Sequence, residues 1–192
     1  MSEIVSKTSN IKWKSANDCY QYIDLSSVEI QTHTISSTME INKTSAPSRA
    51  QQIVQENDVI FATTRPTQMR VCIIPSEYDG QICSTGFCIL RANTDIVSPK
   101  YLFFALSVED FKTYLSNNIT VGNYPSISNN TLKEYLIPIP PIEEQNRIVE
   151  ILDRFDSLTN DLTTGLPAEI EKRRQQYEYY RDKLLTFKRK EA

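Results

Sequence analysis

Glycine is scarce in this chain, since it occupies 4 of 192 positions and is nowhere grouped. A loop that binds the phosphates of a nucleotide, or S-adenosylmethionine, needs grouped glycines at the turn after a strand. The stretch NYPS at 123–126 lacks the paired prolines of the Asn/Asp-Pro-Pro-aromatic motif that holds the target amine in adenine methyltransferases. We therefore expect no cofactor in this chain and no methyl transfer by it.

Histidine is rarer still, because His33 is the only one. Its neighbours in QTHTISS predict a polar strand or loop rather than a catalytic site. Carboxylates are scattered, whereas a magnesium site needs them clustered. The four cysteines form no CxxC pair, which argues against structural zinc and against a disulfide framework, and favours reduced thiols. They are Cys19, Cys72, Cys83 and Cys88. We predict no catalytic residue and no metal site.

Long apolar runs are also missing. No stretch approaches the ~20 residues that a membrane-spanning helix needs, and the N-terminal segment MSEIVSKTSN has no signal-peptide core. We therefore expect a soluble, cytoplasmic protein without membrane contact. The formal net charge of −3 gives no indication of nucleic-acid binding by itself, because DNA-binding domains are normally basic.

The chain does contain enough hydrophobic residues for a core, at 40% of its length. Runs rich in Val, Ile, Tyr, Phe and Thr, bounded by turn residues, predict strands at 20–30, 58–64, 70–75 and 81–90. Helices are expected at 48–56 and 98–118, the second with Ser98 as N-cap and Pro99 in its first turn. Residues 1–140 therefore indicate an α+β domain of several short strands and two helices.

From residue 141 the apolar spacing changes to 3.5 to 3.6 residues, which is typical of an amphipathic helix. Pro141 suits the first turn, and Gly165 with Pro167 predicts a break near 163–167. We expect residues 141–192 to form a long, coiled-coil-like arm. It could pack on its own domain, but its length favours dimerisation or docking to another chain. The candidate interface residues are Ile148, Leu152, Phe155, Leu162, Tyr177 and Leu184.

The segment LIPIPPIEEQNRIVEILDRFDSLTNDLTTGLPAEIEKRRQQYEYYRDKLLTF resembles the conserved helical region of specificity subunits of type I restriction-modification systems. YIDLSSV, NDVIFATTRP, STGFCIL and GNYPSIS resemble their target-recognition domains, in a consistent order. A complete subunit of that family has two such domains and two helical regions, and recognises a split DNA sequence. The resemblance therefore implies a half subunit, two copies of which would replace one complete subunit.

Three stretches contain side chains suited to DNA. In 61–70, arginine can bond guanine, glutamine adenine, and threonine a phosphate, although an ordinary turn is the alternative. Lysines flank a tryptophan in 12–14, although a single tryptophan is as often part of the core. The third stretch, 120–128, is either a contact loop or a structural turn. We hypothesise that the three meet on one face. The candidate DNA contacts are Lys12, Trp13, Lys14, Thr63, Thr64, Arg65, Gln68, Arg70, Asn123 and Tyr124.

We therefore expect a non-catalytic DNA specificity subunit that forms a homodimer and binds double-stranded DNA. The resemblance implies two kinds of partner, the modification subunits and optionally the restriction subunits, and the S-adenosylmethionine, ATP and Mg sites belong to them. Pro140 and Pro141 predict a stiff joint between the domain and the arm. The alternative is a protein adaptor with a dimerising arm and no DNA binding, which the acidic net charge favours.

Overall fold

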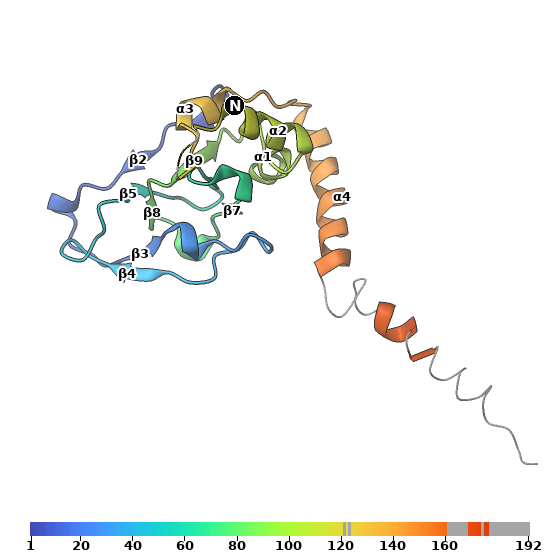
Figure 1. Ribbon diagram of the computed structural model, residues 1–192, viewed down its shortest axis with the longest axis horizontal. Helices are drawn as coiled ribbons and strands as arrows, with labels where there is room; N and C mark the ends of the chain where they lie inside the picture. The colour runs from blue at the N-terminus through green and yellow to red at the C-terminus, as the bar shows by residue number, and fades with distance from the viewer. Residues whose placement is uncertain (121, 123, 161–168, 174, 177–192) are drawn as a thin grey trace, which may run out of the picture. The chain divides into compact units, whose positions relative to one another are not determined.

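The structure is a computed structural model, and it describes residues 1–120, 122, 124–160, 169–173 and 175–176 (Figure 1). Contacts divide the chain into a first compact unit, Met1–Asn146, and a second unit, Arg147–Ala192. The domain division after residue 140 stays a prediction, and the break expected near 163–167 lies outside the described residues. No helix in the described ranges is long and apolar enough to cross a membrane.

Short strands dominate the first unit. They are β1 Val5–Ser6, β2 Ser9–Asn10, β3 Tyr20–Ile23, β4 Met39–Ile41, β5 Ala50–Ile53, β6 Val59–Ala62, β7 Val71–Ile73, β8 Ile82–Ser84 and β9 Phe87–Ala92. The 3₁₀ turns are η1 Trp13–Ser15, η2 Leu25–Ser27, η3 Pro66–Gln68 and η4 Ser76–Tyr78, and the α-helices are α1 Pro99–Ala105, α2 Glu109–Asn118, α3 Asn129–Glu134 and α4 Ile142–Asn160. These elements confirm the mixed α and β domain, whereas a coiled-coil arm stays a prediction.

The strands form two sheets. The four-stranded sheet has the order β1-β9-β6-β7 and is antiparallel throughout. The five-stranded sheet has the order β2-β5-β8-β3-β4, in which only the β3–β8 pair is parallel. Strands β8 and β9 follow one another in the chain but belong to different sheets. The run 81–90 is therefore two strands rather than one, and its short connection at Thr85 and Gly86 joins the sheets.

The main core draws on both sheets. Ile23 of β3 and Cys83 of β8 cluster with Ile60 of β6 and Ile89 of β9, all of them buried. Because side chains alternate along a strand, the neighbouring residues of β3 and β8 point to the other face of the five-stranded sheet. A second, smaller cluster forms there from Tyr22, Ile41, Ala50 and Ile82. All four residues of β6 are buried, which matches the uninterrupted apolar run VIFA.

A buried ion pair joins the sheets at one end. The Asp58 carboxylate, directly before β6, is 1% exposed and accepts two hydrogen bonds from Arg91 of β9, both at 2.8 Å. The same carboxylate accepts from the backbone N–H of Gln55, and Arg91 also donates to the carbonyl of Ile53 at 3.4 Å. The hydrogen-bonded Asp58 raises the pKa of Arg91. The pair thus links β6 and β9 to the end of β5 in the other sheet.

The helix predicted at 98–118 is two helices, α1 and α2. Ser98 is the N-cap as expected, since its hydroxyl accepts from the N–H of Tyr101 at 3.1 Å. The helix ends because Val108 is extended and the hydroxyl of Ser107 bonds the carbonyl of Phe104. Helix α1 packs on β6, β7 and β9, and α2 packs on η3; in Figure 1 they lie together at one side of the strands.

The helix predicted at 48–56 is wrong, because Ala50–Ile53 form strand β5. A nine-residue segment is marginal as an isolated helix, and strand pairing overrides its Ala and Gln propensity. Strand β5 pairs with β2 on one side and β8 on the other. The Gln52 side chain also donates to the carbonyls of Ser84 and Phe87 at 2.8 and 2.9 Å. Tertiary hydrogen bonds therefore decide this segment.

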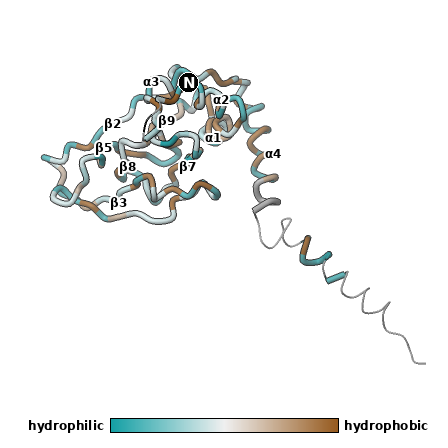
Figure 2. Tube along the Cα trace, viewed as in Figure 1, coloured by the Kyte–Doolittle hydropathy of each residue, from teal (hydrophilic) through white to brown (hydrophobic). Residues whose placement is uncertain are grey.

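Gln145 holds the first turn of α4 within the first unit. Its side chain is fully buried. The amide oxygen accepts from the N–H of Ser98 at 2.9 Å, and the amide nitrogen donates to the carbonyls of Ile96 and Pro140 at 2.9 and 2.8 Å. In the part of helix α4 that is coloured in Figure 2, hydrophobic and hydrophilic residues both occur. The side-chain amide of Gln145 therefore satisfies backbone N–H and C=O groups that have no partner in a helix or strand, and it attaches the start of α4 to the first unit.

Replacing Gln145 by methionine should lower the free energy of unfolding by about 2–4 kcal/mol, because one buried N–H and two carbonyls lose their partner while the volume is kept. The exposed neighbour provides the control, and Asn146→Met should change stability by less than about 0.5 kcal/mol. Denaturant unfolding of the two variants checks this. Equal stability of both would mean that the Gln145 hydrogen bonds are not retained in solution.

Candidate nucleic-acid interface

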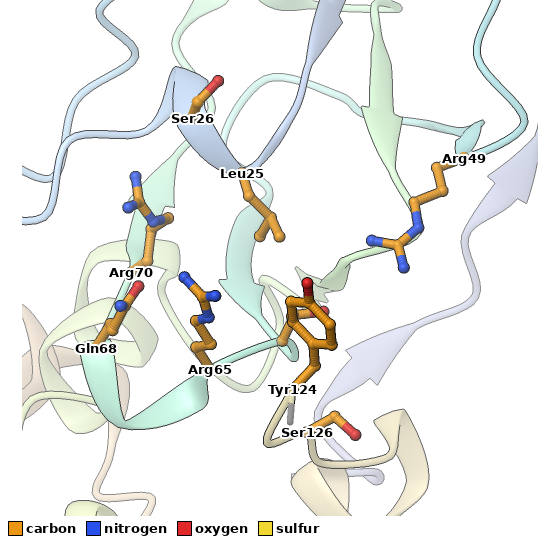
Figure 3. Close-up of a pocket in the computed structure, with 9 residues that line it drawn as sticks. Leu25, Ser26, Arg49, Arg65, Gln68, Arg70, Tyr124 and Ser126 are labelled. Carbon is orange, nitrogen blue, oxygen red and sulfur yellow. The ribbon is translucent and has the colours of Figure 1, made fainter. Parts of the chain in front are cut away.

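A cavity of about 670 Å³ opens where both sheets meet the segment after α2. Its lining combines basic, hydroxyl and aromatic side chains from four separate stretches of sequence, shown in Figure 3. They are Leu25, Ser26, Arg49, Thr64, Arg65, Gln68, Arg70, Tyr124 and Ser126. In Figure 3, Arg65, Gln68 and Arg70 lie on one side of Leu25 and Arg49 on the other.

The turn between β6 and β7 positions the first group. Arg65 and Met69, on either side of η3, both have left-handed backbones, with φ of 51° and 53°. Such angles are uncommon for residues other than glycine, and they occur often at functional sites. The N–H of Arg65 donates to the carbonyl of Pro125 at 2.7 Å, and its carbonyl accepts from Gln68 at 3.0 Å. Hydrogen bonds at both ends therefore hold the turn in this strained form.

The segment 124–127 forms the next wall and is tied to the end of β6. Thr64 and Ser126 form an antiparallel bridge, and the N–H of Ile127 donates to the carbonyl of Thr63 at 2.9 Å. The guanidinium carbon of Arg65 lies 5.6 Å from the centre of the Tyr124 ring. This is a cation–π distance, so the aromatic face restrains the arginine without using its N–H groups.

The turn η2 forms the opposite wall and is held by Asp24. The carboxylate accepts from the N–H groups and the hydroxyls of both Ser26 and Ser27, while the Ser27 hydroxyl in turn accepts from the Asp24 N–H. Partial burial acts to raise the pKa of Asp24, but these hydrogen bonds outweigh it and the pKa is lowered. Asp24 is thus an ionised capping residue whose charge is already engaged by the turn.

The lining is strongly basic. It contains three arginines and no carboxylate, in a chain whose net charge is −3. Arg70 donates to the carbonyl of Val28. In the part of the chain that the structure describes, neither Arg49 nor Arg65 makes a side-chain hydrogen bond or an ion pair. Two guanidinium groups therefore face the cavity with their N–H groups available for an acidic or acceptor-rich ligand.

The structure brings together two of the three stretches predicted to contact DNA. Thr64, Arg65, Gln68, Arg70 and Tyr124 share the cavity, whereas Asn123 lies outside the described residues. These residues, like the rest of the predicted contacts, stay predictions as regards DNA itself.

Thr63 and the stretch 12–14 lie apart from the lining. Thr63 is buried, and its hydroxyl donates to the carbonyl of Gly86 at 3.0 Å. The Trp13 ring packs beside the smaller core cluster, and its N–H donates to the carbonyl of Ala50 at 2.7 Å. Lys12 and Lys14 on either side of it are exposed. Trp13 is therefore part of the core packing, which was the alternative to DNA contact, while Lys12 and Lys14 are on the surface.

Arg49, Leu25, Ser26 and Ser126 complete the cavity but were not among the predicted contacts. Arg49 lies directly before β5, in a segment whose composition favours helix, so its place at a strand end is hidden from local reasoning. The motif DLSS at 24–27 does contain a signal for a capped turn, because Asp at N-cap with Ser three residues later is the pattern of such turns. That signal predicts the turn but not what it faces.

The histidine and three of the four cysteines have structural surroundings, whereas Cys19 is exposed. His33 Nδ1 lies 3.2 Å from the carbonyl of Val71, and the ring contacts Phe103. Burial raises the pKa of Cys72 to about 12 and that of Cys88 to about 11, and it also raises the pKa of Cys83. These thiols stay protonated and unreactive at neutral pH. Among the described residues, no group of His, Cys, Asp and Glu is arranged to hold a metal ion.

The predicted interface residues are described only for the first turns of the arm. Ile148 and Leu152 are half-buried, and Phe155 is 62% exposed. Leu162, Tyr177 and Leu184 lie outside the described residues. Ile151, which was not among the predicted residues, is 40% exposed.

The first unit is thus a mixed α and β domain with a cavity lined by three arginines and no carboxylate. Comparison with known families identifies it further, because residues 3–172 match the type I restriction modification DNA specificity domain. The chain belongs to this family, as its sequence resemblance implies.

Solved structures and characterised relatives agree with this assignment. The crystal structure of the HsdS subunit from Thermoanaerobacter tengcongensis superposes with a TM-score of 0.75 and 34% identity, covering 95% of this chain and 45% of that one. A structure solved for complex assembly and conformational transition of the type I R-M system gives 0.70 and 33%, with the same coverage. The EcoR124I/EcoR124II specificity subunit of Escherichia coli is 47% identical over 93 residues, 48% of this chain and 23% of that protein. The chain thus spans less than half the length of these relatives.

The Asp24 turn leads to a pH-dependent prediction. Asp24→Ala should lower the free energy of unfolding by about 1 kcal/mol near neutral pH, because the η2 cap is lost. Since the folded pKa of Asp24 is lowered, this contribution is fully present above the unfolded pKa of about 3.9 and is lost as the pH falls through the folded pKa. Denaturant unfolding near pH 7 and near pH 3 should show that the loss of unfolding free energy caused by Asp24→Ala is smaller at the lower pH. Asp18→Ala, an exposed control, should show little at either pH, and a constant Asp24 effect would contradict the cap.

Proposed function

We propose that this chain is a DNA-sequence specificity subunit of a type I restriction-modification complex and that duplex DNA binds across the arginine-lined cavity. The observation that carries the proposal is the cavity itself, with three arginines and no carboxylate in its lining. Counterion release depends only on the phosphates that are contacted, so the acidic remainder of the chain does not oppose binding at this face. Family membership supports DNA over another anionic ligand.

The cavity contains the two kinds of contact that sequence recognition requires. Hydroxyls of Thr64 and Ser126 suit phosphate oxygens, and contacts to phosphates fix the position of a protein on the duplex but carry no sequence information. Arginine and Gln68 can distinguish base edges in the major groove. The protein adaptor without DNA binding is not favoured, because it offers no reason for a basic cavity in a family of DNA specificity domains.

The partners are part of the proposal. We propose that two copies of this recognition domain act together on a split target; the chain covers 45% of the HsdS chain with which it superposes, which leaves room for a second such domain. We propose that helix α4 and the residues after it pair these copies and contact the modification subunits, which hold S-adenosylmethionine, and that restriction subunits join the same complex and use ATP and Mg. The exposed Ile151 and Phe155 provide apolar surface for such pairing. A complex that acts on DNA in this way works in the cytoplasm.

Reversing one charge in the cavity tests where DNA binds. Arg49→Glu should weaken retention of a target duplex by the complete complex by at least about tenfold, with the largest effect at low salt. Lys112→Glu makes the same charge change on exposed α2, outside the cavity lining, and should weaken retention by less than about threefold. Filter binding over a range of salt concentrations measures both. Equal losses would contradict the placement of DNA at this cavity.

A second test concerns the arm. If two copies are paired through helical arms, inserting two helical turns after Asn160, seven residues, should move the recognition domains about 10 Å further apart. The unread spacer of the methylated target should then lengthen by about three base pairs. Sequencing of methylated adenines in cells that contain the variant and its partner subunits reveals the spacer. Substituting seven residues in place, without insertion, is the control, and an unchanged spacer would count against paired arms.

A further inference from the structure

The three arginines of the cavity are held in different ways. Arg70 is committed to the carbonyl of Val28. Arg49 is exposed, and its position rests on its own backbone carbonyl, which accepts from Thr85 at 2.9 Å. Arg65 is exposed too, but its backbone is hydrogen-bonded on both sides and its guanidinium lies over Tyr124. Only Arg65 therefore combines available N–H groups with a restrained orientation.

The restraint on Arg65 begins in the backbone. Its left-handed conformation, with φ 51° and ψ 54°, is fixed by the bond to Pro125 on one side and by η3 on the other. Pro66 follows it and is itself buried, so the chain direction after Arg65 has little freedom. A surface loop gains no stability from a strained arginine, and such strain is found where a side chain has to be aimed.

The Tyr124 ring then restrains the side chain. The guanidinium carbon lies over the Tyr124 ring at 5.6 Å from its centre, and this cation–π contact uses none of the guanidinium N–H groups, which stay available to a ligand. The carbonyl of Pro125, directly after Tyr124, accepts the N–H of Arg65 at 2.7 Å. The segment 124–125 therefore contacts both the backbone and the side chain of Arg65. A fixed pair of parallel donors matches two coplanar acceptors rather than a single charge.

We propose that Arg65 recognises a guanine of the target through its O6 and N7 atoms in the major groove, that Tyr124 is the positioning residue that orients it, and that Arg49 binds a backbone phosphate. The inference rests on the proposed DNA-binding function. Guanine is the base that presents two acceptors side by side at its major-groove edge. A phosphate also accepts from an arginine fork, but it can be approached from many directions and does not need the left-handed backbone and the aromatic ring that restrain Arg65.

Base-level binding profiles separate these roles. A library of duplexes with randomised positions, retained by the complete complex, gives the preference of each variant at each position. Arg65→Ala should lose the preference for guanine at one position and weaken binding of the best duplex by about 5- to 150-fold. Arg65→Lys keeps the charge and can still donate to guanine, but it lacks the planar fork and should weaken the same preference less than Arg65→Ala does. Arg49→Ala should weaken all duplexes evenly and reduce the slope of log affinity against log salt by about one, with base preferences unchanged.

Modified bases test the atoms involved. At the guanine position assigned to Arg65, 7-deazaguanine lacks the N7 acceptor and should weaken binding of the unmodified protein. The same base should make little difference to Arg65→Ala, which no longer uses N7. Inosine keeps O6 and N7 and should bind the unmodified protein as guanine does.

Two substitutions of Tyr124 test its positioning role. Tyr124→Phe keeps the ring and should keep the guanine preference, whereas Tyr124→Leu should relax it at the same position as Arg65→Ala. Thermal unfolding of each variant verifies that it is folded.

Three results would overturn the assignment: unchanged base preferences in Arg65→Ala, an equal effect of 7-deazaguanine on both proteins, or a Tyr124→Leu variant with full guanine preference. The proposed function fails differently, because in that case the unmodified complex would retain no duplex selectively and no consensus would emerge from the library.

Discussion

The buried pair of Asp58 and Arg91 is the interaction on which the arrangement of the sheets depends. A carboxylate that is 1% exposed must be paired and hydrogen-bonded, since burying an isolated charge costs several kcal/mol. Arg91 meets this need with two hydrogen bonds at 2.8 Å and also reaches the carbonyl of Ile53 at the end of β5. The ion pair therefore fixes neighbouring ends of β6 and β9, and the bonds to Gln55 and Ile53 attach the end of β5 to the same buried charge.

The cavity lies at the other ends of the same strands. Strand β6 leads from Asp58 to Thr63 and Thr64, while β9 leads back from Arg91 towards Gly86, whose carbonyl accepts both the N–H and the hydroxyl of Thr63. Strands β5, β6 and β9 are only four to six residues long, so a shift at the ion pair would be carried to the cavity. The loop residues that line the cavity are thus attached to short paired strands that meet at the ion pair.

Several parts of this architecture can be predicted from local sequence, and others cannot. The apolar run VIFA predicts a buried strand, and Ser98 with Pro99 predicts a helix start, because each signal lies within a few residues. Arg65, Gln68 and Tyr124 are DNA-binding candidates by side-chain chemistry taken together with the family resemblance, because the chemistry alone fits an ordinary turn as well. Arg49 does not, because AQQI beside it favours helix in isolation, and only pairing with β2 and β8 makes it a strand. Trp13 was a candidate by chemistry, but the structure uses its N–H in a hydrogen bond to the carbonyl of Ala50.

The sequence by itself determined the mixed α and β domain, the change to helical spacing after Pro141 and the family resemblance, since these depend on composition, periodicity and motifs along the chain. The tertiary structure alone decided that Arg49 from β5, Arg65 from the turn after β6 and Tyr124 from the segment after α2 share one cavity. It also decided that Gln145 closes the first turn of α4 on Ile96 and Ser98. The physical reason is that these contacts join residues tens of positions apart, and pairing partners at that separation leave no periodic signal in sequence.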